Sequence, residues 1–575
     1  MSNAERQQNT KTAIHRSRTL LLLSLFALGL MLRVPGLLFN GMRDLDEITF
    51  EWGCGVRELG LAAAFNENYG VFSYALYGIC VTLAEQLPRY WWAPYKLMEI
   101  SFEVAVLLAL YTLLPAGRKH FALLTYWINP WFILHGAWQG FWDGPHTLLA
   151  LIAVICLGWV RRVRLSWFLA GTSLMASAMF KPQGLVHFVM PLGVYLGLQL
   201  FVNRRSPFVW FALGLLSALT LITVLLVAGG GDVLAIPSNY LTAARAMPKL
   251  CNDCINIWRP ITRILQAVLG QSGRPTYRLW LPGSLYPLLH LLAFSAASVL
   301  IVVFSLRIPL TQERQMSCSK AQLTLFVRIA GLVTLLLCTL LLVMTMSPGQ
   351  DAWIVAARQS PRYALTLGML SLIGGVAVFA ASQIAHFAQR VLRAIEGISQ
   401  SSVAGTSRQA LSPHLDVLLI LAFSSLVIAQ VGTRAHIHHA YAGLVLLIPL
   451  AMASRRILLP WAAMLGIHFY SLLAVYQLGR SIVLPQWFLD YPPAQSLISQ
   501  IDAALAGRTY DPLLQFQSSV NQFLTHYLPQ EPIISVLSAA QFICLLIIVY
   551  EMFALTARPI SSAILDSGLG RQAEL

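Results

Sequence analysis

Three carboxylates within four residues follow the first apolar stretch of the chain, which ends at Phe39: Asp44, Asp46 and Glu47. At a lipid–water boundary, grouped carboxylates could act as a general base or bind a cation. They could also form the acidic start of a solvated helix, because the positive end of the helix dipole favours negative charge. These residues are therefore candidates for proton abstraction.

Two short turns carry a carboxylate and a cation. Asp143 stands among aromatic residues in the turn that begins at Trp138, with Gln139 close by. An idle charge near the membrane is costly, so Asp143 is either functional or a solvated member of an aromatic belt. Lys181 and Gln183 lie between two short apolar stretches. Lys181 is a compact cation suited to phosphate, although such a lysine often extends to a lipid headgroup.

A basic segment between two apolar stretches contains Arg434, His436, His438 and His439. Arginine and histidine both donate hydrogen bonds to phosphate, so the segment could bind an anion. A zinc site would require a further fixed ligand beside the two histidines that share a helix face, His436 and His439. Arg358 and Arg362 belong to a second mixed cationic and aromatic segment. That segment could hold a sugar and a phosphate, or it could be an ordinary interfacial belt.

The elements that position these residues must lie in lipid. The chain has 575 residues, of which 57% are hydrophobic and only 11% are charged. Soluble domains carry about 25% charged residues. The formal net charge of +15 is explained by basic residues that anchor loops on the cytoplasmic side, and we find no pattern typical of a nucleic-acid groove. We therefore predict an all-α, multi-pass membrane protein, since an open backbone cannot stay unpaired in hydrocarbon.

A membrane span needs about 20 mostly apolar residues, and the sequence contains about fourteen candidates. They lie near residues 20–39, 93–115, 121–136, 147–160, 165–180, 184–202, 208–228, 285–306, 322–346, 362–385, 414–431, 440–453, 457–478 and 534–556. With the tail at 1–19 in the cytoplasm, nearly every short turn on that side holds basic residues. This asymmetry predicts the orientation of the chain and places the tail at 557–575 in the cytoplasm as well.

The predicted outer side receives the long connections at 40–92, 229–284 and 479–533. Amphipathic stretches within 47–90 predict helices that lie along the membrane interface. The candidate residues described above fall in predicted outer turns or, for Arg362, at the edge of one. We therefore divide the chain into a catalytic membrane module at 20–478, the outer loop at 479–533 and a last span at 534–556.

In their order along the chain, these segments resemble the GT-C superfamily of membrane glycosyltransferases. The resemblance lies in Asp44-Leu45-Asp46-Glu47, Asn129-Pro130, Trp138-Gln139-Gly140 with Asp143, Lys181-Pro182-Gln183, and the segment from Arg434 to Tyr441. Two departures stand out. Gly140 and Gln139 are transposed relative to the family pattern, with Asp143 one residue later, and the glutamate expected beside His439 is absent.

The resemblance implies a GT-C-like bundle and inverting transfer of a hexose, most simply mannose or glucose, from a polyprenyl-phosphate donor to a glycan, lipid-linked or protein acceptor. Asp46 or Asp44 would be the base, and Asp143 would hold the acceptor or orient the base. Arg434, His438 or His439, and Lys181 would stabilise the leaving phosphate. The resemblance implies no metal or other cofactor. The sequence contains no Asn-x-Ser/Thr sequon, which favours a bacterial plasma membrane over the endoplasmic reticulum.

Other functions stay open at this stage. An O-antigen-type polymerase or ligase also uses outer-face arginine and histidine with a lipid-linked donor. A lipid or solute transporter would place ionisable residues in mid-span, where Arg33 is the clearest charge. A purely structural membrane subunit is a further alternative. The gathering of charges at one rim of the predicted bundle favours an interfacial enzyme.

Overall fold

The structure is a computed structural model that describes residues 3–41, 45–65, 69–87, 90–114, 118–202, 207–245, 256–268, 285–305, 413–431, 437–476 and 531–557. The N-terminal elements are α1 (Asn3–Arg33), η1 (Val34–Leu38), η2 (Leu45–Phe50), α2 (Glu51–Leu59), α3 (Leu61–Ala64), α4 (Val71–Ala84) and α5 (Ala93–Leu113). The central elements are α6 (Lys119–Ala122), η5 (Leu123–Trp127), α7 (Pro130–Ile133), η6 (Leu134–Trp138), α8 (Gly144–Trp159), α9 (Val163–Phe180), η7 (Leu185–Val189), α10 (Met190–Val202) and α11 (Phe208–Ala228). The remaining elements are α12 (Ala235–Arg245), α13 (Trp258–Val268), α14 (Leu285–Ser305), α18 (Pro413–Val431), η9 (Ile437–Ala440), α19 (Tyr441–Leu446), α20 (Ile448–Ala453), α21 (Arg455–Tyr476) and α25 (Glu531–Ala557).

All of these elements are helical, as expected for a chain that crosses a membrane. Five of the described helices are long and apolar enough to span one: Thr19–Leu38, Phe208–Ala228, His414–Val431, Arg455–Ala474 and Ser535–Ala554. Helices also occupy the other expected apolar stretches that the structure covers. The stretches expected at 322–346 and 362–385 lie outside the described residues. The first predicted outer loop is helical as well, in α2, α3 and α4.

The helix expected at 121–136 is interrupted at Asn129 and Pro130. Helical structure ends at Trp127 and begins again at Pro130. The Asn129 side chain accepts a hydrogen bond of 3.0 Å from the backbone N–H of Trp131, which starts the new helix. Pro130 occupies the first helical position, where its missing N–H is not needed.

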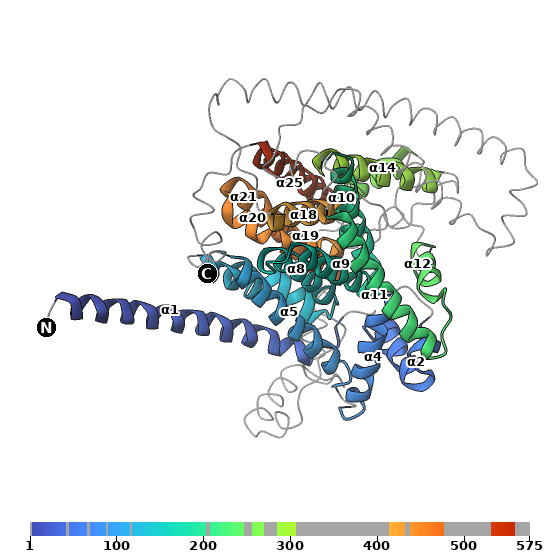
Figure 1. Ribbon diagram of the computed structural model, residues 1–575, viewed down its shortest axis with the longest axis horizontal. Coiled ribbons are helices and arrows are strands. Elements are labelled where there is room, and N and C mark those ends of the chain that lie inside the picture. Colours follow the sequence, from blue (N-terminus) through green and yellow to red (C-terminus); the bar gives the residue numbers. More distant parts are fainter. Residues whose placement is uncertain are drawn as a thin grey trace, which may run out of the picture.

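The centre of the bundle is formed by α8, α9, α18 and α19, with α5 alongside, while α1 extends away from it (Figure 1). Helices α8 and α9 form an antiparallel pair, so the start of α8 and the end of α9 lie at the same end of the bundle. Two hydrogen bonds join the pair: Ser177 Oγ to the His146 carbonyl at 2.8 Å and Ser173 Oγ to the Leu149 carbonyl at 2.7 Å. This hairpin fixes the register between the two turns that carry Asp143 and Lys181.

Helix α9 packs closely against α11 through two glycines. A Cβ added at Gly171 would strike the Phe211 carbonyl oxygen, and one at Gly214 would strike the Phe168 carbonyl oxygen. Small residues let helix backbones approach closely in membranes. We expect Gly171→Ala to lower the free energy of unfolding by about 1–3 kcal/mol, because the rigid backbone opposite must shift.

Thermal unfolding in detergent checks this expectation. Gly466→Ala is the matched control, since nothing lies within 4 Å of a Cβ added at that position in α21. The control should match or slightly exceed the midpoint of the parent protein, because alanine favours a helix more than glycine does. Equal midpoints for the two variants would contradict the close packing of α9 against α11.

Candidate functional site

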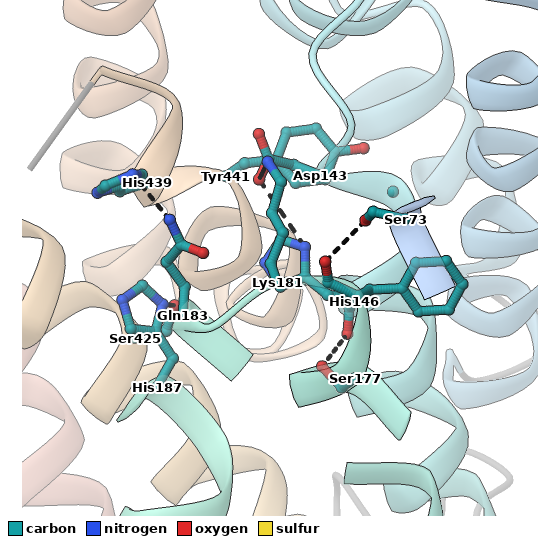
Figure 2. Close-up of polar contacts among 12 residues, drawn as sticks. Ser73, Asp143, His146, Ser177, Lys181, Gln183, His187, Ser425, His439 and Tyr441 are labelled. Atoms are coloured by element: carbon teal, nitrogen blue, oxygen red, sulfur yellow. Dashed lines mark hydrogen bonds and ion pairs between the residues drawn. The ribbon is translucent and has the colours of Figure 1, made fainter. Parts of the chain in front are cut away.

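A buried ion pair joins the two turns at one end of the α8–α9 hairpin. Lys181 Nζ donates a hydrogen bond of 2.7 Å to Asp143 Oδ1, and each residue is only 2% exposed. Figure 2 shows the two side chains pointing toward each other from separate elements. Burial excludes two alternatives left open by the sequence, a solvated aspartate and a lysine that extends to a lipid headgroup.

The Asp143 carboxylate does not cap α8, the helix that follows it. Asp143 precedes α8 but makes no side-chain hydrogen bond to it, although an aspartate in this position normally caps a helix. The N–H of Gly144 is bound instead by Glu99 Oε1, at 2.9 Å. The second carboxylate oxygen of Asp143 lies 3.2 Å from His135 Nε2, and His146 Nδ1 lies 3.8 Å from the first. The carboxylate is therefore directed toward Lys181 and two histidines.

Both partners of the ion pair are charged at neutral pH. Burial acts to raise the pKa of Asp143, but the Lys181 ammonium and the neighbouring His135 imidazole hold that pKa well below its usual range. Burial acts to lower the pKa of Lys181, and the Asp143 carboxylate raises it above its ordinary value. Two opposite charges thus face each other in a site closed to water.

The first predicted outer loop is tied to this site through the end of α9. The carbonyl of Phe180 accepts hydrogen bonds from Ser73 Oγ at 2.7 Å and from the backbone N–H of Gly70 at 3.1 Å. The neighbouring Tyr69 ring faces Lys181 Nζ at 5.4 Å, a cation–π arrangement. The start of α4 therefore lies beside the ion pair.

The histidine segment contacts the site from the other side. The His438 ring stacks on Phe141, with centroids 4.7 Å apart. His439 Nε2 lies 3.2 Å from Gln183 Nε2, a hydrogen bond that Figure 2 shows beside the ion pair. The short element η9 thus brings two imidazoles to the turns of Asp143 and Lys181.

Further buried histidines surround the ion pair. The His135 ring stacks on Tyr441 at 4.6 Å, and Tyr441 shares a hydrogen bond of 2.7 Å with the Tyr126 hydroxyl. His187 Nδ1 lies 3.2 Å from Ser425 Oγ, which links η7 to α18. The sequence analysis missed His135, His146 and His187. The placement of His146 one helical turn after Asp143 was the available signal.

The acidic segment lies against the same turn as the histidines. Leu45 is fully buried, and its side chain comes within 3.2 Å of a Cβ built on Gly140. Gly140 has a φ of +80°, which only glycine adopts readily. Leu45 contacts Gly140, and His438 stacks on Phe141, the next residue. The backbone of Asp46, one residue after Leu45, is therefore close to the turn that ends at Asp143.

The structure thus brings six predicted site residues into one region: Gln139, Asp143, Lys181, Gln183, His438 and His439. It gives the backbone of Asp46 and Glu47 within η2 and not their side chains. Asp44, Arg358, Arg362, Arg434 and His436 lie outside the described residues.

Helix α5 carries a buried charged stripe that the sequence analysis missed. Lys96, Glu99 and Glu103 are all completely buried, and their spacing of three and four residues puts them on one face. Glu103 Oε2 accepts a hydrogen bond of 2.6 Å from Arg33 Nε. Ionisable residues therefore also lie within a predicted span, in addition to those gathered at the rim. The helical spacing of these residues in an apolar stretch was the signal.

Lys96 fixes the chain segment before the acidic loop. Its ammonium donates to the carbonyls of Gly36 and Phe39, each at 2.7 Å, and of Trp138 at 2.6 Å. Lys96→Met would leave these oxygens without a donor, so we expect the free energy of unfolding to fall by about 3 kcal/mol. Thermal unfolding in detergent measures the loss, and Lys119→Met is the control.

A variant with a smaller side chain at position 96 tests the three hydrogen bonds to these carbonyls directly. Lys96→Ala leaves space beside the three oxygens, so added propylammonium should restore part of the lost stability. Tetramethylammonium, which has no N–H donor, should not. Equal effects of the two cations would contradict the role of the Lys96 hydrogen bonds.

Within the part of the chain that the structure describes, no group of three or more His, Cys, Asp or Glu side chains is arranged to hold a metal ion. The charged pair, the imidazoles and the nearby acidic segment can instead bind hydroxyl and phosphate groups. No protein-family model, curated protein or solved structure matches the chain.

Proposed function

We propose that this chain is an inverting glycosyltransferase. It transfers a hexose, mannose or glucose, from a polyprenyl-phosphate donor to a glycan, lipid-linked or protein acceptor at the outer face of the membrane. The observation that carries the proposal is the buried Asp143–Lys181 pair, which follows a turn that contacts Leu45 at Gly140 and His438 at Phe141. The likeness of the sequence to the GT-C pattern supports the same function.

In the proposed reaction an acceptor hydroxyl attacks C1 of the donor sugar. Its proton passes to the carboxylate of Asp46, or of Asp44, as the new C1–O bond forms. The bond between C1 and the phosphate oxygen breaks, and its electron pair stays on the lipid phosphate. One displacement at C1 inverts the configuration of the sugar.

The leaving lipid phosphate is already a stable anion, so it needs charge stabilisation more than a proton. Lys181 and the imidazoles of His438 or His439 supply hydrogen-bond donors, together with Arg434 from the adjoining segment. In a buried site such fixed donors stabilise developing charge more strongly than water would. A phosphate that shares Lys181 with Asp143 would leave that carboxylate able to bind an acceptor hydroxyl.

A transfer assay tests the proposal. Purified protein in lipid nanodiscs is incubated with radiolabelled polyprenyl-phosphate mannose, glucose and arabinose, together with membrane glycan acceptors. We expect label transfer from one hexose donor, lost in Lys181→Met and retained in Lys119→Met. Absence of transfer from all three donors, or unchanged transfer by Lys181→Met, would overturn the proposal.

A proton-coupled transporter is the second candidate, and the α5 stripe is the observation that favours it. Glu99 and Glu103 are fully buried within a helix of 21 residues, and transporters use such intramembrane carboxyls as proton relays. Proteoliposomes with an imposed pH gradient distinguish the two functions. A transporter would move protons across the membrane together with its cargo, whereas the transferase would leave the gradient intact.

A further inference from the structure

Two glutamates of α5 share one buried environment. Glu99 and Glu103 are one helical turn apart, and neither is exposed. Both face Gly136 of η6, where an added Cβ would strike Glu103 Oε1 and lie 3.4 Å from Glu99 Cγ. Two carboxylates this close in a dry interior repel each other, so each needs a countercharge or a proton.

Glu103 has its countercharge. Arg33 Nε donates to Glu103 Oε2 at 2.6 Å. The same guanidinium is held by the carbonyls of Gly29 and Trp127 and lies 3.7 Å above the Trp127 ring. Arg33 is 1% exposed, so these contacts fix it in place. The charge of Glu103 is therefore balanced within the structure.

The neighbouring cations are already engaged elsewhere. Lys181 pairs with Asp143 at 2.7 Å, and the Lys96 ammonium is bound by three backbone carbonyls. No ion pair joins Glu99 to any cation in the described ranges. Three carboxyl groups are buried here, those of Glu99, Glu103 and Asp143. Only two cations pair with them, since Arg33 pairs with Glu103 and Lys181 pairs with Asp143.

The hydrogen bonds of Glu99 are too few for a buried carboxylate. Its Oε1 accepts one bond of 2.9 Å from the Gly144 N–H. Its Oε2 is buried and has no hydrogen-bond partner among the residues that the structure covers. Burying an ionised carboxylate with a single donor is strongly unfavourable, and taking up a proton removes that penalty.

We propose that Glu99 is a proton-binding site whose occupancy is set by the Asp143–Lys181 ion pair. Glu99 holds a proton while Asp143 neutralises Lys181, and it releases that proton to solvent when Lys181 loses its partner. The inference goes beyond the proposed transferase, since it concerns a proton-binding site that sugar transfer does not require.

The titratable groups that act on Glu99 explain this coupling. They are Glu103 on the same helix, Arg33 through Glu103, Asp143, Lys181, and the hydroxyls of Tyr126 and Tyr441. The two tyrosine hydroxyls bind each other at 2.7 Å. Of the two cations, Arg33 keeps its own partner, so Lys181 is the one that a change at Asp143 would redirect toward Glu99.

Infrared spectroscopy of the purified full-length protein tests the site. The carbonyl stretch of a protonated carboxyl is separate from that of a carboxylate and shifts in D₂O. We expect a component of this band at neutral pH in the parent protein that is lost in Glu99→Gln and unchanged in Glu551→Gln, whose carboxylate pairs with Arg456 at 3.5 Å. The carboxyl of Asp416, which is also buried without a hydrogen-bond partner among the described residues, gives a separate component that both variants retain. Glu99→Asp should keep the band and move its frequency, which assigns it even if the glutamine variant does not fold.

The coupling has its own test in the same spectra. Asp143→Asn removes the partner of Lys181, so the Glu99 band should fall several-fold. In Asp143→Asn/Lys181→Met both charges are gone, and the band should return to its parent amplitude. Bands that are identical in the parent protein and both Glu99 variants would overturn the site. An unchanged band in Asp143→Asn would overturn the coupling.

Discussion

Lys181→Met and Asp143→Asn should each lower the free energy of unfolding by about 3–5 kcal/mol, and the double variant should lose less than either. Each single change leaves one charge buried and unpaired, because both residues are 2% exposed. Methionine and asparagine keep nearly the shape of the original side chains. The double variant buries two neutral groups in place of an isolated charge.

The asparagine variant should fall at the lower end of this range. If Glu99 releases its proton when Lys181 loses Asp143, the new carboxylate partly compensates the ammonium. Lys181→Met offers no such substitute, because neither nearby fixed cation is available: Arg33 of α1 is held by Glu103, and Lys96 of α5 is held by backbone carbonyls.

A double-mutant cycle measured by thermal unfolding in detergent gives the coupling energy. The control cycle uses Arg57→Met and Glu85→Gln, which remove an ion pair whose side chains are 35% and 49% exposed. Exposed pairs contribute about 0–1 kcal/mol. A coupling energy for Asp143 and Lys181 as small as that of the exposed pair would show that the buried pair is not held as described.

The double variant should regain stability without regaining transfer activity. Asp143→Asn/Lys181→Met restores a compatible interior but supplies no ammonium for a leaving phosphate. We therefore expect a protein of nearly parental stability that transfers no label in the nanodisc assay. Full transfer by the double variant would show that the variant folds and that the reaction does not require the Asp143–Lys181 ion pair.

The apolar helices were predictable because hydrocarbon leaves the backbone no alternative to helix. The stretch at 208–228 coincides with α11, and that at 165–180 lies within α9 (Val163–Phe180). The break in the stretch at 121–136 was not predicted. Hydropathy alone does not register that the Asn129 side chain and Pro130 together begin a new helix, although both residues carry known helix-start signals.

Several residues of the candidate site were predictable from the sequence, but the contacts between them were not. Asp143 and Lys181 were both singled out, yet their contact depends on the register of α8 against α9, which sequence spacing does not give. Lys96 escaped notice because its partners are backbone carbonyls of Gly36, Phe39 and Trp138, which carry no sequence signature. The available signal was the helical spacing of Lys96, Glu99 and Glu103 within an apolar stretch.

Substitution of the proposed base should have the largest effect on transfer. A positioned general base contributes about 10²–10⁴-fold to rate, so Asp46→Asn should lower kcat by that factor if Asp46 is the base. Asp44→Asn is tested separately, and the variant with the larger loss identifies the base. The affected variant should lose the acid limb of the pH–rate profile, because that limb reports ionisation of the base.

The packing of the acidic segment allows a loss of kcat in Asp46→Asn to be separated from a loss of local structure. Leu45 is buried and packs the segment against Gly140, so an asparagine at position 46 leaves that contact in place. Glu58→Gln is the matched control, since its side chain is 63% exposed on α2 beside Arg57. Single-turnover rates with the active donor separate chemistry from binding. An enzyme indifferent to the loss of both Asp44 and Asp46 uses neither aspartate as its base, and the polymerase or ligase chemistry that depends on basic residues would then describe it better.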